Sequence, residues 1–170
     1  TSMPPIWFYP ESSQPYDILL GFHFTFAASF KITKCSNGTS IHLIQVSSSS
    51  INISSAVRCS SGQLPRIVHT ISSSSEKTLN FDSYFLKGDE FVVALAHDGT
   101  SLKTFVDGSL QSSVHLHGMA LLRLAPALLQ LCCENVSASA ELIQSVFYDE
   151  VLNNRDLDSI CLYLQSVIRP

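Results

Sequence analysis

The amino-acid sequence predicts an all-β sandwich of antiparallel strands with one short helix at the C-terminal end. Three observations support this: apolar and polar residues alternate at 22–32, two Asp-Gly dipeptides lie within 90–114, and almost no helical periodicity precedes residue 120. Short strands separated by turn residues at this spacing are typical of two packed sheets. Because 170 residues can bury a substantial core, residues 1–170 are predicted to form a single domain.

The alternation is clearest at residues 22–32. Apolar residues, four of them phenylalanines, occupy the even positions, and polar residues such as His23, Thr25 and Lys31 occupy most of the odd ones. Successive side chains of a strand point to opposite faces, so period two predicts one face on the core and one nearer solvent. Further strands are expected at 41–46, 50–57, 64–71, 79–85, 127–133 and 141–148.

Residues 90–114 predict three antiparallel strands joined by two tight turns, at Asp98-Gly99 and Asp107-Gly108. Asp-Gly is a strong hairpin signal because a type I′ turn needs positive φ at both central residues. The turns account for both aspartates, so neither is assigned a catalytic role.

The two ends of the chain differ from this strand pattern. Residues 1–18 are predicted as an extended lead-in, rich in proline, whose Trp7, Phe8 and Tyr9 cover one end of the core. Residues 153–166 are predicted as a short amphipathic helix closing the domain.

The helix prediction depends on its start signal and on one apolar face. Asn153 is a good N-cap, and Asp156, three residues later, is positioned to return the bond as in a capping box. The residues expected on the buried face are Leu157, Ile160, Cys161 and Leu164.

Composition excludes several classes of partner. Charged residues make up only 14% of the chain and the net charge is −4, so there is no electrostatic reason to expect nucleic acid. No stretch reaches the roughly 18 consecutive apolar residues of a membrane-spanning helix. The N-terminus shows no basic region followed by an apolar one, so no signal peptide is expected in it.

Cysteines and asparagines bear on the cellular compartment. Five cysteines are an odd number, which requires at least one free thiol or an intermolecular bridge, and their spacing matches no zinc pattern. Three sequons make Asn37, Asn52 and Asn135 candidate glycosylation sites. They slightly favour an extracellular or cell-surface location, and an intracellular scaffold remains the alternative.

Three segments together resemble the laminin G-like, concanavalin A-like jelly-roll superfamily. Residues 24–32 (FTFAASFKI) are similar to an early strand of that family, residues 91–108 to its hairpins, and residues 145–153 to a strand that enters a short helix. The best local match is Phe105-Val106-Asp107-Gly108. The chain departs from the family at Ser29-Phe30, where tryptophan is common, and at residues 129–133, which replace two glycines.

The resemblance implies an antiparallel two-sheet jelly-roll sandwich and a recognition function. Extracellular members bind glycans or protein receptors, some of them through calcium, and similar domains in large intracellular scaffolds of the BEACH type mediate protein contacts. Both branches match this chain about equally well. In calcium-binding members the ligands lie in loops at one rim, which makes Asp98, Asp107, Glu134 and Asn135 the residues to consider.

No residue pattern supports catalysis. The E-x-D-x-x-E arrangement of jelly-roll glycosidases is missing, and so is the G-x-S-x-G of serine hydrolases. His115 and His117 share one strand face, but two imidazoles are too few for a metal site and His97 as a third is a guess. Cys132 and Cys133 are predicted to be structural.

The sequence therefore predicts a non-catalytic recognition module of a larger protein, not an enzyme. The expected function is mainly protein–protein interaction in adhesion or scaffold assembly, and the alternative is a carbohydrate-binding, lectin-like module. Galectin-type residues are missing, which favours a protein partner over a glycan. No cofactor is expected, calcium being the open alternative, and the oligomeric state is not indicated.

Overall fold

The computed structural model describes residues 4–8, 16–21, 23–49, 51–73, 78–80, 84–115, 125–131 and 138–168. Within these ranges the chain forms antiparallel strands and a C-terminal helix. The elements are β1 (Ile6–Phe8), β2 (Tyr16–Leu20), β3 (His23–Cys35), β4 (Ser40–Ser48), β5 (Ile51–Arg58), β6 (Arg66–Ser73), β7 (Thr78–Asn80), β8 (Tyr84–Phe85), β9 (Glu90–Asp98), β10 (Ser101–Val106), β11 (Ser109–His115), β12 (Ala125–Leu131), β13 (Ala138–Tyr148) and α1 (Asn154–Ile168).

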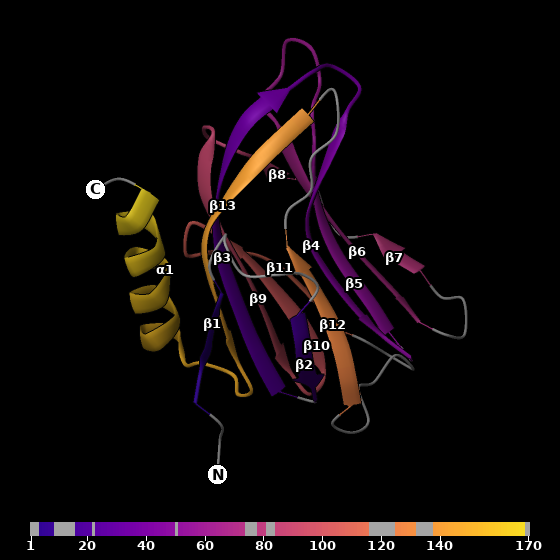
Figure 1. The fold of residues 1–170 in the computed structure, drawn as a ribbon, viewed down its shortest axis with the longest axis vertical. Helices are drawn as coiled ribbons and strands as arrows, with labels where there is room; N and C mark the ends of the chain where they lie inside the picture. The colour runs from indigo at the N-terminus through magenta and orange to yellow at the C-terminus, as the bar shows by residue number, and fades with distance from the viewer. Residues whose placement is uncertain are drawn as a thin grey trace.

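The strands make two packed sheets (Figure 1). Sheet A has the order β1-β13-β3-β9-β10-β11, and sheet B has the order β2-β12-β4-β5-β6-β7, with β8 also paired to β6. Helix α1 lies against sheet A on the side away from sheet B (Figure 1). The predicted all-β, antiparallel two-sheet jelly-roll sandwich with a short C-terminal helix is confirmed.

The main core lies between the two sheets. Sheet A contributes buried phenylalanines and sheet B contributes branched aliphatic residues, because each strand points alternate side chains inward. Phe30 and Phe91, directly opposite in the β3–β9 register, pack with their rings tilted by 31° and their centroids 5.9 Å apart. The other core residues that are at most 2% exposed include Phe24, Phe26, Ile41, Leu43, Ile44, Ile53, Ile67, Ile71 and Leu86.

The second face of β3 corrects one prediction. Its odd positions were expected nearer solvent, but Thr25 and Ser29 are at most 1% exposed. Helix α1 covers this face, and small residues such as Ala27, Ala94 and Ala96 let it approach the sheet closely. The centre of sheet A is therefore buried on both sides, and β9 is buried along nearly its whole length.

The N-terminal lead-in also differs from its prediction. Within residues 1–18, predicted as an extended lead-in with no strand assigned, β1 pairs with β13 and β2 pairs with β12. Phe8 does enter the inter-sheet core, but Trp7 lies on the opposite face of sheet A and packs beside α1. Tyr9 lies outside the described residues.

Helix α1 starts as predicted. The Asn153 Oδ1 accepts a hydrogen bond from the Asp156 N–H at 2.8 Å, and the Leu157 N–H donates to the Asn153 carbonyl oxygen at 2.9 Å. The N-cap is confirmed, whereas the return bond from the Asp156 side chain stays a prediction. Leu157, Cys161 and Leu164 are buried and Ile160 is half-buried.

The two Asp-Gly turns differ from each other. At Asp107-Gly108 both residues have positive φ, 51° and 84°, as a type I′ turn requires. At Asp98-Gly99 only the glycine does, with φ of 98°, so the predicted type I′ geometry is wrong there. The Asp98 side chain explains the difference, since it accepts hydrogen bonds from the next residues and stabilises another turn.

Replacing Gly108 with valine is expected to destabilise the protein by about 2 kcal/mol, because a β-branched residue is strained at positive φ. A Cβ at this position would lie 3.7 Å from the Cys161 Cβ, an ordinary contact, so the cost comes from the backbone. Urea unfolding measures the change. Gly88→Val is the matched control, because no positive φ is recorded there and a Cβ would meet nothing within 4 Å. Equal stability of the two variants would contradict this account.

Candidate functional site

The predicted aspartates are turn formers at opposite ends of β10. The Asp98 Oδ1 accepts hydrogen bonds from the Ser101 N–H at 2.8 Å and the Thr100 N–H at 3.0 Å, and these bonds lower the pKa of Asp98 from 3.8 to about 2. The Asp107 Oδ1 accepts from the Val92 N–H at 3.0 Å. Because β10 separates them, the two carboxylates form no shared ion site.

The predicted histidine and cysteine sites are not brought together as ligands. His97 is fully buried at the end of β9, where its ring stacks on Phe24. His115 is exposed at the end of β11. In the described part of the chain, no three His, Cys, Asp or Glu side chains are grouped to hold a metal ion. The other candidates lie outside the described residues: His117, Cys132, Cys133, Glu134 and Asn135.

Cysteines 35 and 59 form a disulfide, with Cα atoms 5.5 Å apart. It joins the end of β3 to the segment after β5, where the Gly38 N–H also donates to the Cys59 carbonyl oxygen. Cys161 is free and lies on the buried face of α1, and burial, with Asp158 and Asp107 nearby, raises its pKa to about 11. Its thiol is protonated at neutral pH and is therefore a poor nucleophile.

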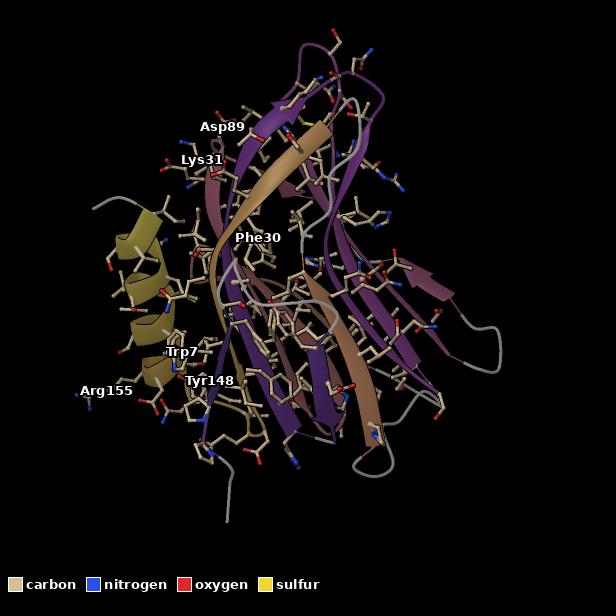
Figure 2. All side chains as sticks on the ribbon, viewed as in Figure 1. Trp7, Phe30, Lys31, Asp89, Tyr148 and Arg155 are labelled. Atoms are coloured by element: carbon tan, nitrogen blue, oxygen red, sulfur yellow. A yellow bond between two sulfur atoms is a disulfide. The ribbon has the colours of Figure 1, made fainter. Side chains whose placement is uncertain are left out.

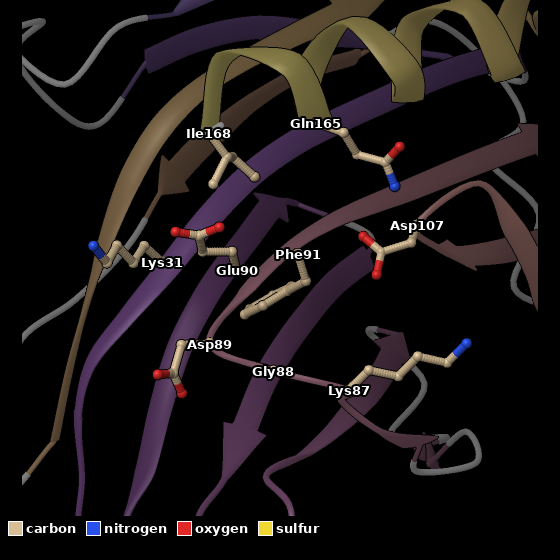
Figure 3. Close-up of a pocket in the computed structure, with 9 residues that line it drawn as sticks. All are labelled: Lys31, Lys87, Gly88, Asp89, Glu90, Phe91, Asp107, Gln165 and Ile168. Atoms are coloured by element: carbon tan, nitrogen blue, oxygen red, sulfur yellow. The ribbon is translucent and has the colours of Figure 1, made fainter. Parts of the chain in front are cut away.

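A pocket of about 650 Å³ opens at the C-terminal end of α1 (Figure 3), and we call it the α1 pocket. Its walls come from β3, the segment before β9, the β10–β11 turn and the helix. The lining residues are Lys31, Lys87, Gly88, Asp89, Glu90, Phe91, Asp107, Gln165 and Ile168. Six of these nine residues are charged or polar, and Phe91 belongs mainly to the inter-sheet core, so the pocket is mainly polar.

Charges of both signs surround the α1 pocket. Three carboxylates and two ammonium groups give a net charge of −1, since 2 − 3 = −1. Lys31 and Glu90 lie directly opposite in the β3–β9 register, and Figure 3 shows the ammonium ends of Lys31 and Lys87 at opposite sides of the pocket. A pocket with both carboxylates and ammonium groups is better suited to binding the charged side chains of another protein than to binding a single small ion.

Three aromatic residues, Trp7, Tyr148 and Tyr163, lie along the seam between α1 and the edge of sheet A, and we call them the aromatic seam. The rings of Trp7 and Tyr163 meet edge to face, with centroids 5.6 Å apart at 79°. Figure 2 shows Trp7 and Tyr148 near the N-terminal half of α1, whereas Lys31 and Asp89 of the α1 pocket lie towards its other end.

One hydrogen bond and two nearby carboxylates surround the tyrosines of the aromatic seam. The Tyr163 hydroxyl donates to the Gln144 Oε1 at 3.4 Å, and its side chain remains 45% exposed. Burial raises the pKa of Tyr148, and the nearby carboxylates of Asp156 and Glu150 raise it further. The seam is therefore an aromatic surface bordered by acidic groups.

Leu162 adds an apolar side chain on the outer side of α1, and at 65% it is the most exposed of the large hydrophobic residues described. The sequence pattern predicted the buried face of α1 but not this exposed apolar one. A signal was present, because Leu162 and Tyr163 fall outside the stripe of Leu157, Cys161 and Leu164. Two large apolar residues on the polar side of an amphipathic helix are unusual.

The candidate glycosylation sites are exposed where the structure describes them. Asn37 lies in the turn between β3 and β4, and Asn52 is the second residue of β5. Asn135 lies outside the described residues. In the same described ranges, no helix is long and apolar enough to span a membrane.

Comparison with known proteins gives a similarity of fold. No family model matches the chain, and no curated protein matches its sequence. Among solved structures, the receptor binding domain of botulinum neurotoxin D is similar with a TM-score of 0.66 and 12% identity over 96% of this chain and 42% of that one.

Two further structures are of the binding domain of botulinum neurotoxin DC. One, in complex with SialylT, has a TM-score of 0.62 and 14% identity over 84% of this chain and 35% of that one. The other, in complex with rat synaptotagmin II, has a TM-score of 0.60 and 14% identity over 84% and 36%. The chain thus spans about 35–42% of the length of these structures, and what they share with it is a β-sandwich fold.

Proposed function

We propose that the chain is a non-catalytic recognition module of a larger protein, which binds mainly proteins in adhesion or assembly and needs no cofactor. The observation that carries this proposal is the exposed aromatic and apolar surface on the outer side of α1. Leu162 and Tyr163 are 65% and 45% exposed, and Trp7 contacts Tyr163 directly. The assigned roles of Asp98, Asp107 and Cys161 in turns and packing leave none of them for catalysis.

Physical features of protein interfaces support this surface as the binding site. Tyrosine, tryptophan and arginine are enriched among the residues that dominate binding energy, since they bury large areas at small entropic cost. Arg155 lies one turn before Ser159 and two turns before Leu162, on the same exposed side of α1. The α1 pocket would add charged contacts at the other end of the helix, which improves specificity.

A carbohydrate-binding module is the second candidate, favoured by the aromatic seam. An aromatic ring beside carboxylates and amides is suited to stacking on a sugar while its hydroxyls are hydrogen bonded. Two of the structures that contain a similar sandwich are complexes, one with SialylT and one with rat synaptotagmin II, and this chain spans 35–36% of their length.

We also propose membership of the laminin G-like, concanavalin A-like superfamily. The segments that carry the resemblance fall on paired elements: residues 24–32 lie in β3, residues 91–108 span β9 and β10, and residues 145–153 lead from β13 to α1. The cell surface or extracellular space is the proposed location, because disulfides persist in oxidising compartments.

Protein and glycan arrays probed with the disulfide-bonded protein test the function. We expect protein hits that Tyr163→Ala weakens by about 2 kcal/mol, as for an interface hot spot. Leu162→Asp should weaken the same hits, because it places a charge in the apolar contact. Leu64→Asp is the matched control, since Leu64 is 51% exposed away from α1 and its replacement should leave binding unchanged.

Three results would change the proposal. A glycan hit that Tyr163→Ala removes, without protein hits, would make the carbohydrate-binding candidate correct. Equal loss of binding in Leu64→Asp and Leu162→Asp would exclude α1 as the binding surface. Hits that disappear in EDTA would show that calcium takes part.

A further inference from the structure

Two sequons lie near opposite ends of strand β5 of sheet B: Asn52 near its start, and Asn37 in the β3–β4 turn beside its other end. Ile51 and Ile53 are buried in the inter-sheet core, so the alternation of β5 places Asn52 and Ser54 on the opposite, outward face. Asn52 is exposed, and β5 has paired neighbours on both sides. Asn37 is exposed near the far end of the strand, in the turn beside Cys59.

The geometry at Asn37 presents its amide for modification. The Asn37 Oδ1 accepts a hydrogen bond from the Ser61 N–H at 2.7 Å, so the carboxamide is held by its oxygen alone. A glycan bonds to the nitrogen, Nδ2, and retains the carbonyl oxygen as an acceptor. The bond to Ser61 can therefore persist in the modified protein.

The surroundings of Asn52 form a row across sheet B. Leu128 of β12 pairs with Ser47 of β4, Ser47 with Asn52, and Asn52 with Ser72 of β6. Strands are about 4.8 Å apart, which puts Leu128 within roughly 10 Å of Asn52 on the same face. Leu128 is 46% exposed, so this row has an apolar side chain that a sugar can cover.

We propose that Asn37 and Asn52 carry N-linked glycans, and that the glycan on Asn52 covers the outer face of sheet B. In this reaction the Nδ2 of asparagine attacks the anomeric carbon of a lipid-pyrophosphate-linked oligosaccharide. The new carbon–nitrogen bond replaces the bond to the pyrophosphate, which leaves with the lipid, and Nδ2 loses one proton. No oxidation or reduction is involved.

The disulfide is an independent observation that points to the same compartment. Cys35 and Cys59 are bonded, and disulfides form and persist where secreted proteins fold, which is also where this glycosylation occurs. Helix α1 lies on the other side of the sandwich (Figure 1), so glycans on sheet B leave the aromatic seam and the α1 pocket accessible. The proposal does not depend on which partner binds there.

Expression with a signal peptide in glycosylating eukaryotic cells tests the sites, with occupancy measured by peptide mass spectrometry after enzymatic release of the glycans. We expect both asparagines to be occupied. Ser54→Ala should lose the glycan on Asn52, and Ser54→Thr, which preserves the sequon, should keep it. Thr39→Ala and Thr39→Ser form the same matched pair for Asn37. An unmodified Asn37 or Asn52 in secreted, disulfide-bonded protein would overturn the assignment.

Hydroxyl-radical footprinting tests whether the glycan covers the face. Leu128 and Leu162 are exposed leucines on opposite sides of the sandwich. We expect the glycosylated wild type to lose labelling at Leu128 relative to Ser54→Ala, with labelling of Leu162 equal in the two proteins. Equal labelling of Leu128 would contradict a glycan-covered face.

Discussion

Lowering the pH from 7 to 4 is expected to reduce the free energy of unfolding by about 3 kcal/mol through His69 alone. His69 lies on β6 and is only 1% exposed, facing the inter-sheet core. Its Nδ1 is 2.7 Å from the Ser55 Oγ, and its Nε2 is buried without a hydrogen-bond partner among the described residues. Burial lowers the pKa of His69 from 6.5 to about 4.

The direction follows from proton uptake. Between pH 6.5 and pH 4 the unfolded chain protonates this imidazole, whereas the native protein keeps it neutral. The unfolded state then binds more protons, so stability falls as the pH falls through this window. Well above pH 6.5 both states are neutral and His69 contributes nothing, and well below pH 4 both states are protonated and its effect is complete. The lowered pKa of Asp98 acts only below about pH 3.8, outside this window.

The measurement is urea unfolding at pH 7 and at pH 4. The double variant Ser55→Ala/His69→Leu removes the titrating group together with its partner, so no buried polar atom is left unpaired. We expect this variant to lose about 3 kcal/mol less than the wild type over the same interval. His42→Gln is the control for removing a histidine, because His42 is exposed on the outer face of sheet B and the buried pair of His69 and Ser55 stays in place. An equal pH dependence of wild type and double variant would exclude His69 as the cause.

Local patterns predicted the sandwich because each strand carries its own signal. In β3 the even positions predicted the inner face correctly, with Phe24, Phe26 and Phe30 at most 1% exposed. Among the odd positions, His23 and Lys31 are exposed as predicted, but Thr25 and Ser29 are buried because α1, more than 120 residues later, covers them. Period two separates the two faces of a strand, but it does not reveal whether the polar face meets solvent or another element.

The errors at the N-terminus and at Asp98 have similar causes. Strand β1 has three residues, too few for an alternation to be recognised, and it exists because β13 provides a partner. Asp98 has the residue type of a type I′ turn, yet its side-chain bonds to Thr100 and Ser101 stabilise a different geometry. The conformation was decided by the pairing with β13 in the first case and by the hydrogen bonds to Thr100 and Ser101 in the second.

The candidate site was not predictable from any one segment. The α1 pocket combines Lys31, Glu90, Asp107 and Gln165, which come from four different parts of the chain. Trp7 and Tyr163 are separated by almost the whole sequence and contact each other because β1 and α1 both pack along β13. Both surfaces form only when segments far apart in the sequence pack together. Local sequence patterns therefore predict the fold but not the candidate binding site.

Replacing Cys35 and Cys59 together with serine is expected to destabilise the protein by about 3.5 kcal/mol. The bond closes a loop across a sequence separation of 24 residues, and opening that loop increases the conformational entropy of the unfolded chain. The native turn should persist, because backbone hydrogen bonds link Gly38 to Cys59 and Cys59 to Thr39. The midpoint of urea unfolding should therefore fall, while strand content by circular dichroism should stay unchanged.

Chemical reduction separates the bond from the residues. A thiol reductant should lower the stability of the wild type towards that of the double variant, and it should leave the double variant unchanged. Cys161 does not interfere, since its thiol is free in both proteins. A wild type that is insensitive to reductant would show that Cys35 and Cys59 are not bonded in solution. The compartment inferred for the protein would then lose its structural support, and the intracellular scaffold would become the better explanation of this domain.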